Sequence, residues 1–181
     1  MPRDPYERAD AIYRTLDRSE TVRFGVNQSA LNTQAAKAHD FGGSAHVETA
    51  ALLAYESLTR HVTAILEVLA AFHAENGGAL TADINQEHST FWARARLKNA
   101  VTAKKATFKC TRQPESEKHY TELVDGKHAS NARQLLDSTL TTFFSEANPD
   151  KPAGWVERGL RAARKLGIDL AASALKTAAD P

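Results

Sequence analysis

The chain has little of what disulfide-bonded, thiolate-metal or membrane-spanning proteins require. Its 181 residues include one cysteine, Cys110, which excludes an internal disulfide and an all-thiolate metal site. No apolar run approaches the roughly 18 residues that a membrane-spanning helix needs. The amino terminus lacks the apolar segment of a secretory signal, so we expect a cytoplasmic protein. There are only 9 glycines and 6 prolines, and this scarcity favours helix.

Motifs of catalysis and cofactor binding are also missing. The sequence has no phosphate-binding glycine loop, nucleophile elbow or dinucleotide fingerprint. The seven histidines form neither an HExxH nor an ExxH pair. Asp125 and His128 are close in sequence, but we expect them in a glycine turn. We therefore predict a protein with no cofactor, no metal ion and no enzymatic activity.

Hydrophobic periodicity predicts an all-α fold, a single-domain helical bundle over residues 1–181. Its strongest element is one long central helix over residues 45–75, which contain neither glycine nor proline. The apolar stripe of this helix consists of Val47, Ala51, Ala54, Leu58, Val62, Ile65, Leu69 and Phe72. At 1.5 Å per residue the helix would be roughly 40 Å long, so we expect it to be the spine of the bundle.

We expect about six helices in all. The other five cover residues 5–17, 29–39, 83–108, 128–147 and 152–166, the last continuing through 168–179. Residues 18–28 and 111–127 lack a helical period, which predicts an extended connector and a long loop. Ser44 and Asp83 are the expected N-caps of the helices that follow them.

Negative charge is absent from residues 88–114, which contain seven lysines and arginines. Residues 1–87 carry 7 basic and 12 acidic side chains, whereas residues 88–181 carry 16 basic and 10 acidic ones. The two halves therefore have net charges of −5 and +6, although the whole chain is only +1. Such asymmetry predicts contact with a nucleic acid, an acidic protein or another copy of the chain.

On a helical projection, most of these cations share one sector about 60° wide. We call this group the basic stripe; it consists of Arg94, Lys98, Lys105, Lys109 and Arg112. Arg96 and Lys104 fall elsewhere, and Leu97, Val101 and Phe108 form an apolar seam beside the stripe. If the helix persists through the last cation, the stripe is about 27 Å long, a length suited to a row of phosphates. The alternative is a solvated face paired with acids from residues 1–87.

A second basic cluster strengthens the expectation of a polyanionic partner. One side of the helix expected at residues 152–166 carries Arg158, Arg161, Arg164 and Lys165. Its apolar side has few bulky residues, so we expect burial in the bundle and no membrane insertion. Phe91 and Trp92 precede the stripe and are expected in the core. The sequence thus predicts contact with the nucleic-acid backbone, without reading of bases.

In architecture and charge the chain resembles the small helical subunits of CRISPR effector complexes. The positions that carry the resemblance are Arg94, Lys98, Lys105, Lys109 and the cluster at residues 158–165. The resemblance implies a non-catalytic subunit of an antiviral ribonucleoprotein that holds RNA or single-stranded DNA by its backbone. It also implies contacts with other protein subunits, including further copies of the chain.

Two alternatives remain open. Arg112 and His119 form an R-x6-H pattern that looks like the catalytic motif of the HEPN ribonucleases, although Pro114 interrupts the interval. That resemblance implies an all-helical ribonuclease whose Arg and His lie at the start of a helix and meet their copies across a dimer. The third reading is a helical adaptor or antitoxin-like protein that binds an acidic protein.

Overall fold

The computed structural model describes residues 5–76, 84–110 and 113–145, and these residues form helices joined by short connectors, with no strand. The elements are α1 (Glu7–Lys37), α2 (Ser44–Glu75), α3 (Gln86–Lys105), α4 (Pro114–Leu123), the π-helical turn η1 (Val124–His128) and α5 (Ala129–Ser145). The last three follow one another without a break. The described residues therefore form four helices, the fourth being α4–η1–α5.

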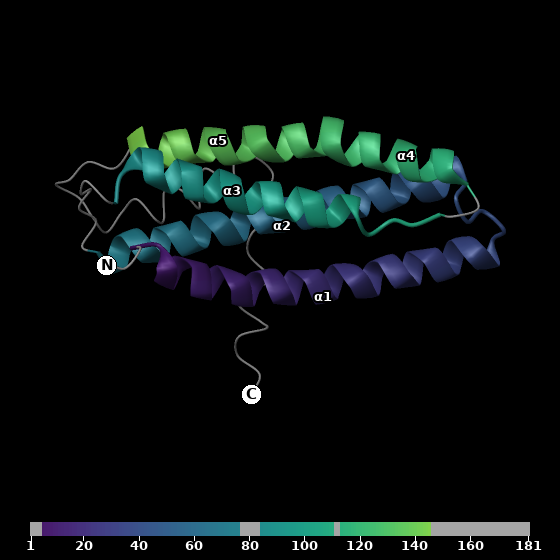
Figure 1. Cartoon of the computed structure of the whole chain (residues 1–181), viewed down its shortest axis with the longest axis horizontal. Coiled ribbons are helices and arrows are strands. Elements are labelled where there is room, and N and C mark those ends of the chain that lie inside the picture. Colours follow the sequence, from purple (N-terminus) through teal and green to yellow (C-terminus); the bar gives the residue numbers. More distant parts are fainter. Residues whose placement is uncertain (1–4, 77–83, 111–112, 146–181) are drawn as a thin grey trace.

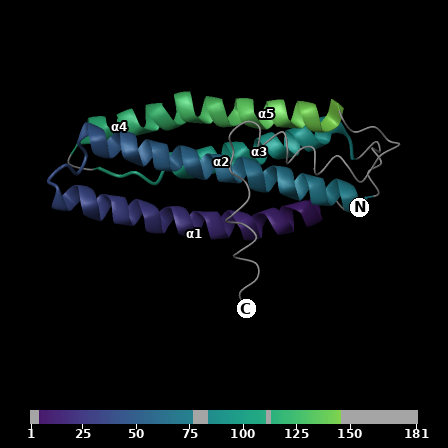
Figure 2. The same ribbon diagram turned by 180° about the vertical axis from the view of Figure 1, so that it is seen from behind.

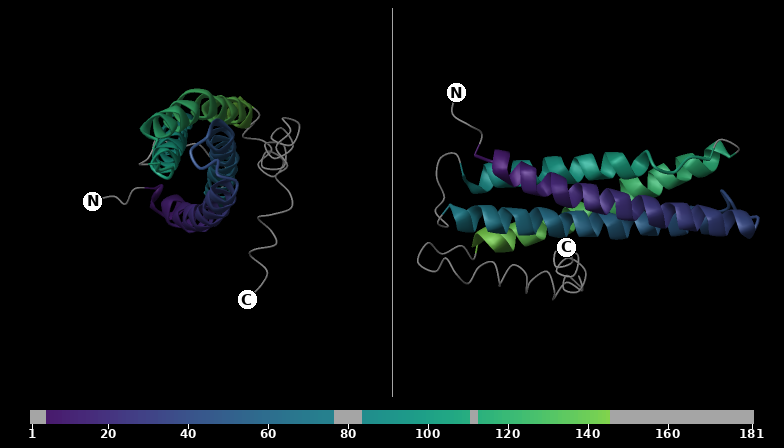
Figure 3. Two further views of the ribbon diagram at one scale, coloured as in Figure 1. Left: turned by 90° about the vertical axis from the view of Figure 1, so that its right-hand side faces the viewer. Right: turned by 90° about the horizontal axis from the view of Figure 1, so that it is seen from below.

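The four helices run up, down, up and down along one long axis, as Figures 1 and 2 show from opposite sides. Seen end-on in Figure 3, they surround a common interior. The predicted all-α bundle is confirmed, whereas the predicted count of about six helices is not. One reason is that α1 unites two predicted helices. The sixth predicted helix falls in residues 146–181, outside the described residues.

The central helix agrees closely with the sequence. α2 begins one residue before the predicted start, ends at the predicted residue and contacts every other helix. All eight residues of its predicted apolar stripe are buried. Its N-cap is Gly43 in an extended conformation, so the prediction that Ser44 caps the helix was wrong. His61 on this helix is a buried, hydrogen-bonded core residue.

The extended connector predicted for residues 18–28 was wrong, because α1 is helical throughout. The buried positions of this segment are Glu20, Phe24 and Gln28, which repeat every four residues. Val22 and Val26 are instead 67% and 63% exposed. Two of the three core-facing positions are thus polar, and this hides the helical period from a hydrophobicity pattern.

The long loop predicted for residues 111–127 was also wrong over its described part. Pro114 occupies the first turn of α4, where its fixed backbone angle suits a helix start and no N–H is needed. Tyr120 and Val124 are buried four residues apart. Gly126 lies inside η1 and does not end the helix. The loop prediction failed because proline and glycine were interpreted as breakers at positions where a helix tolerates them.

Candidate nucleic-acid interface

The helix that carries the basic stripe is fixed at both ends by hydrogen bonds. At its start, the Asn85 side chain accepts a bond of 2.9 Å from the His88 N–H, so Asn85 is the N-cap. The expected cap, Asp83, lies outside the described residues. At its end, the Lys104 carbonyl accepts hydrogen bonds from the Thr107 N–H and the Tyr120 hydroxyl. These contacts stop α3 at Lys105.

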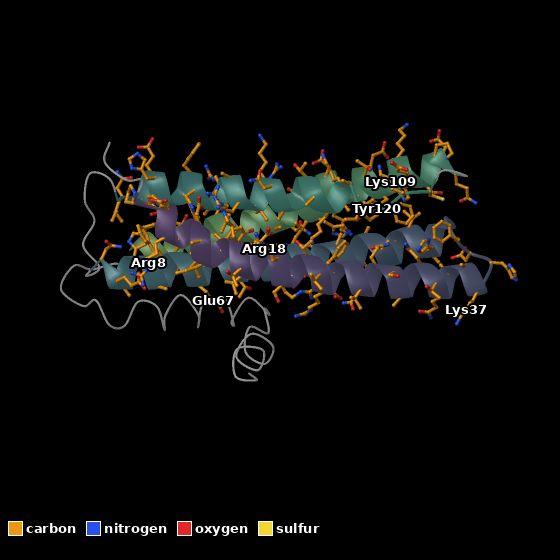
Figure 4. The ribbon with its side chains drawn as sticks, turned by 60° about the horizontal axis from the view of Figure 1, so that its bottom comes forward. Arg8, Arg18, Lys37, Glu67, Lys109 and Tyr120 are labelled. Atoms are coloured by element: carbon orange, nitrogen blue, oxygen red, sulfur yellow. The ribbon has the colours of Figure 1, made fainter. Side chains whose placement is uncertain are left out.

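The early end of α3 corrects the predicted length of the stripe. Phe108 lies beyond the helix and stacks on Tyr120 with ring centroids 4.8 Å apart. Lys109 therefore belongs to the connector after α3, and Figure 4 shows it with Tyr120 at the end of the bundle where α4 begins. From Arg94 to Lys105, the helical part of the stripe spans about 17 Å. The expected apolar seam beside it, Leu97, Val101 and Phe108, is buried.

An exposed aromatic ring lies at the start of the stripe. We expected Phe91 and Trp92 in the core, and Trp92 is buried there, but Phe91 is 76% exposed. Together with Arg94 and Lys98, Phe91 lines a shallow depression on the outer face of α3. The other lining residues are Gln86, Glu87, Thr90 and Ala95. A phenyl ring and two cations thus share one open surface.

Ion pairs with the fourth helix hold part of the basic stripe. They join Arg94 to Asp137 at 2.9 Å, Lys105 to Asp125 at 3.2 Å and Lys109 to Glu117 at 2.7 Å. The hydrogen bond from Lys109 lowers the pKa of Glu117. Within the described ranges, Lys98 has no acid at ion-pair distance. These three acids come from residues 113–137, whereas the alternative of a solvated, paired face had placed them in residues 1–87.

Two further cations of the acid-free segment turn inward. Arg96 donates a hydrogen bond to Asp10, and Asp10 also accepts a bond of 2.7 Å from the Trp92 indole. The guanidinium of Arg96 lies 5.2 Å from the centroid of the Trp92 ring. Lys104 is buried with its Nζ 4.1 Å from the centroid of Phe24. Burial lowers the pKa of Lys104. Lys104 therefore belongs to the interior of the bundle and Arg96 is partly buried, in line with their place outside the stripe.

The interior next to Lys104 contains a polar cluster that sequence reasoning missed. Glu20 accepts hydrogen bonds from the Ser57 hydroxyl at 2.7 Å and from Arg60 Nε at 2.9 Å. His61 Nδ1 lies 3.2 Å from the Tyr13 hydroxyl. The cluster links α1 to α2 through charged and polar groups in a buried setting. A four-residue repeat that includes polar residues could have revealed it.

A buried serine–histidine pair is the arrangement closest to catalytic geometry among the described residues. Ser89 Oγ lies 3.0 Å from His73 Nε2 and 2.7 Å from the Tyr6 hydroxyl. The first distance is the one expected of a nucleophile and its base. All three side chains are buried, however, and Phe143 and Phe144 pack against the imidazole. A substrate cannot reach the serine. Ser89, His73 and Tyr6 therefore form a core contact that joins α3 and α2 to the start of α1.

Other predicted chemical groups are exposed, buried or outside the described ranges. His119 is exposed on α4, and Cys110 is buried beside Gly42. His128 is buried against Tyr55 in η1, so the glycine turn predicted there was wrong. No group of three metal-ligating side chains occurs among the residues that the structure describes. The predicted site residues outside them are Arg112, Arg158, Arg161, Arg164 and Lys165.

Comparison with protein-family models, with curated proteins and with solved structures finds no match to this chain. Within its described part, no helix combines the length and apolar content that a membrane crossing requires. Function must therefore be argued from the surface chemistry of α3 and from the charge distribution.

Proposed function

We propose that the chain binds nucleic acid through the outer face of α3, with phosphates on the exposed cations of the basic stripe. The proposal rests on one observation: Arg94 and Lys98 lie on one open face of a helix, within a 27-residue segment that has no acidic residue. A row of cations on a rigid helix complements the regular charge of a phosphate backbone. The interface offers no motif that reads base sequence, so binding would depend little on sequence.

The ion pairs of the stripe are compatible with such binding. Arg94 has a side chain 60% exposed, and its partner Asp137 is also solvent-accessible. Exposed pairs of this kind contribute only about 0–1 kcal/mol each. A phosphate can therefore replace the carboxylate at little cost. The like-charged neighbours Arg94 and Lys98, one helical turn apart, would repel each other less when a phosphate lies between them.

The proposed role is that of a non-catalytic subunit of a cytoplasmic ribonucleoprotein. This follows the resemblance to the small helical subunits of CRISPR effector complexes, and it includes contacts with other subunits and further copies of the chain. An elongated four-helix bundle suits such a role because it presents long faces on several sides (Figure 3). The basic cluster at residues 158–165 belongs to the same expectation from the sequence but lies outside the described residues.

The most direct test compares two charge reversals of equal size. Lys98→Glu removes the central cation and places a glutamate four residues after Arg94, a spacing at which opposite charges attract, so the helix should fold. Lys37→Glu makes the same charge change at the far end of α1, where Figure 4 labels Lys37. We expect fluorescence anisotropy with labelled oligonucleotides to show weakened binding for Lys98→Glu alone. Equal affinity of the two variants would reject the α3 interface.

A gain-of-binding variant complements the reversal. Asp137→Asn frees Arg94 from its ion pair and removes one negative charge from its surroundings. Affinity for nucleic acid should rise at low salt and converge with that of the wild type as salt screens the surface. If the purified protein binds no nucleic acid and instead holds an acidic protein that survives nuclease treatment, the adaptor reading replaces this proposal.

The second candidate function is a HEPN-like ribonuclease. One observation favours it: α4 starts at Pro114, two residues after Arg112, so the R-x6-H pattern leads into a helix start. His119 lies exposed in the second turn of this helix. Purified protein should then cleave RNA, and His119→Ala should abolish the cleavage. Cleavage that persists in His119→Ala, or no cleavage by the wild type, removes this candidate.

A further inference from the structure

Phe91 is the most exposed of the large apolar side chains in the described structure, and its ring has no role in the core. Its neighbour Trp92 is buried and fixed by a hydrogen bond to Asp10. The partly exposed Phe41 packs on His46 at 5.0 Å. The phenyl ring therefore lies on the same open surface as Arg94 and Lys98, where a partner can reach all three side chains.

Helical geometry aligns the ring with the cations. Phe91, Arg94 and Lys98 lie within a sector about 60° wide, and successive residues are about 4.5 Å and 6 Å apart along the axis. All three line the same shallow depression. This spacing along the helix would let the Phe91 ring lie against one nucleobase while Arg94 and Lys98 bind the phosphates next to that base.

An acidic residue limits the path of the strand at one end. Glu87 lies one turn before Phe91, lines the same depression and would repel a phosphate. A neutral base over Phe91 avoids that repulsion. The charge pattern therefore directs the backbone from Phe91 toward Lys98 and away from the start of α3.

We propose that Phe91 stacks on one unpaired nucleobase while Arg94 and Lys98 hold the adjoining phosphates, so that the chain prefers single-stranded nucleic acid to duplex. The inference rests on the proposed function and specifies its substrate class. Single strands are required because both faces of a paired base are covered by its neighbours in the stack. Stacking on an aromatic ring tolerates any base, which agrees with an interface that lacks sequence-reading groups.

The test measures anisotropy with labelled 12-nucleotide dT and rU strands and with a 12-base-pair duplex, at low salt. Phe91→Ala should weaken single-strand binding about 5- to 150-fold, the range that one lost stacking contact produces. Phe91→Trp should retain the affinity, whereas Phe91→Leu should lose it although the side chain stays apolar. Val22→Ala is the matched control, because it removes an exposed apolar side chain from α1. The dT and rU arms show whether DNA and RNA bind alike.

The outcomes separate this inference from the proposed function. If wild type binds both nucleic-acid forms and Lys98→Glu weakens both, the backbone interface stands. Stacking is then supported only if Phe91→Ala selectively weakens single-strand binding. An unchanged affinity of Phe91→Ala, or an equal loss with duplex, overturns the stacking inference alone. Absence of nucleic-acid binding by wild type overturns both.

Discussion

Mild acid should destabilise the fold through two buried histidines. Burial, together with the nearby charges of Lys104 and Arg60, lowers the pKa of His61 to about 3. Asp17 Oδ1, 3.6 Å from His61 Nδ1, and the Tyr13 hydroxyl also face the imidazole. Burial likewise lowers the pKa of His73 to about 4. Their side chains are only 1% and 3% exposed, so water cannot solvate the protonated rings.

The sign of the effect follows from proton linkage. A histidine in the unfolded chain has a pKa of about 6.5, above both folded values. Below about pH 6.5 the unfolded state therefore binds more protons, and the stability from the neutral rings is lost as the pH falls toward 4 and 3. At pH 4.5 each histidine costs about 2.5–2.7 kcal/mol, so the pair lowers the free energy of unfolding by about 5 kcal/mol. Above about pH 6.5 the stability is fully present.

The measurement is urea unfolding followed by helical circular dichroism at pH 7.5 and pH 4.5. The comparison is between wild type and the double variant His61→Gln/His73→Gln, which keeps polar side chains that do not titrate. The loss of stability between the two pH values should be about 5 kcal/mol smaller in the double variant. His119→Gln makes the same substitution at an exposed histidine and serves as the surface control.

Two results would refute the reasoning. The first is a wild-type free energy of unfolding that does not change between pH 7.5 and pH 4.5. The second is the same pH dependence in wild type and in the double variant, because carboxylates or the buried His46 and His128 would then account for acid unfolding. The single variants His61→Gln and His73→Gln should each remove about half of the pH-dependent loss of stability.

Three further predictions concern stability and are measured by chemical or thermal unfolding. Leu58→Ala should lower the free energy of unfolding by about 2–5 kcal/mol, because Leu58 is fully buried in the core and the change leaves a cavity. Asn85→Ala should cost about 1 kcal/mol, since it removes the N-cap hydrogen bond of α3. Gly42→Ala should lower the midpoint of thermal unfolding. Gly42 has φ +87°, and an added Cβ would lie 2.8 Å from Cys110 Sγ.

The sequence predicts an element well where burial and hydrophobicity coincide. α2 shows this, because its apolar stripe is continuous and every residue of it is buried. α1 shows the opposite case. Glu20 occupies a core position where Arg60 and Ser57 satisfy its carboxylate, and Val22 is exposed. The pairing depends on a helix some 40 positions away in sequence, so local patterning cannot reveal it.

The candidate interface was likewise predicted only in part. Helical periodicity predicted that Arg94 and Lys98 share a face beside a buried seam, and both are exposed on α3. It could not predict that Asp137 faces Arg94, because the bundle topology brings α5 beside α3. Phe91 was placed in the core because a large aromatic residue is usually buried. Its projection beside Arg94 was the signal that could have placed it on the surface.

Within the part of the chain that the structure describes, the charge asymmetry of the sequence does not become two opposite faces. Asp10 and Glu20, from the acidic half, bind Arg96 and Arg60 inside the bundle. The acids that form ion pairs with the basic stripe come from the basic half, so the stripe is partly neutralised by residues of the same half. The salt dependence of nucleic-acid binding distinguishes an interface with two phosphate contacts from one with about four. A slope of log K against log salt near −1.4 indicates two single-strand phosphate contacts, whereas a slope near −2.8 indicates about four. The steeper value would mean that the paired lysines exchange their acids for phosphates.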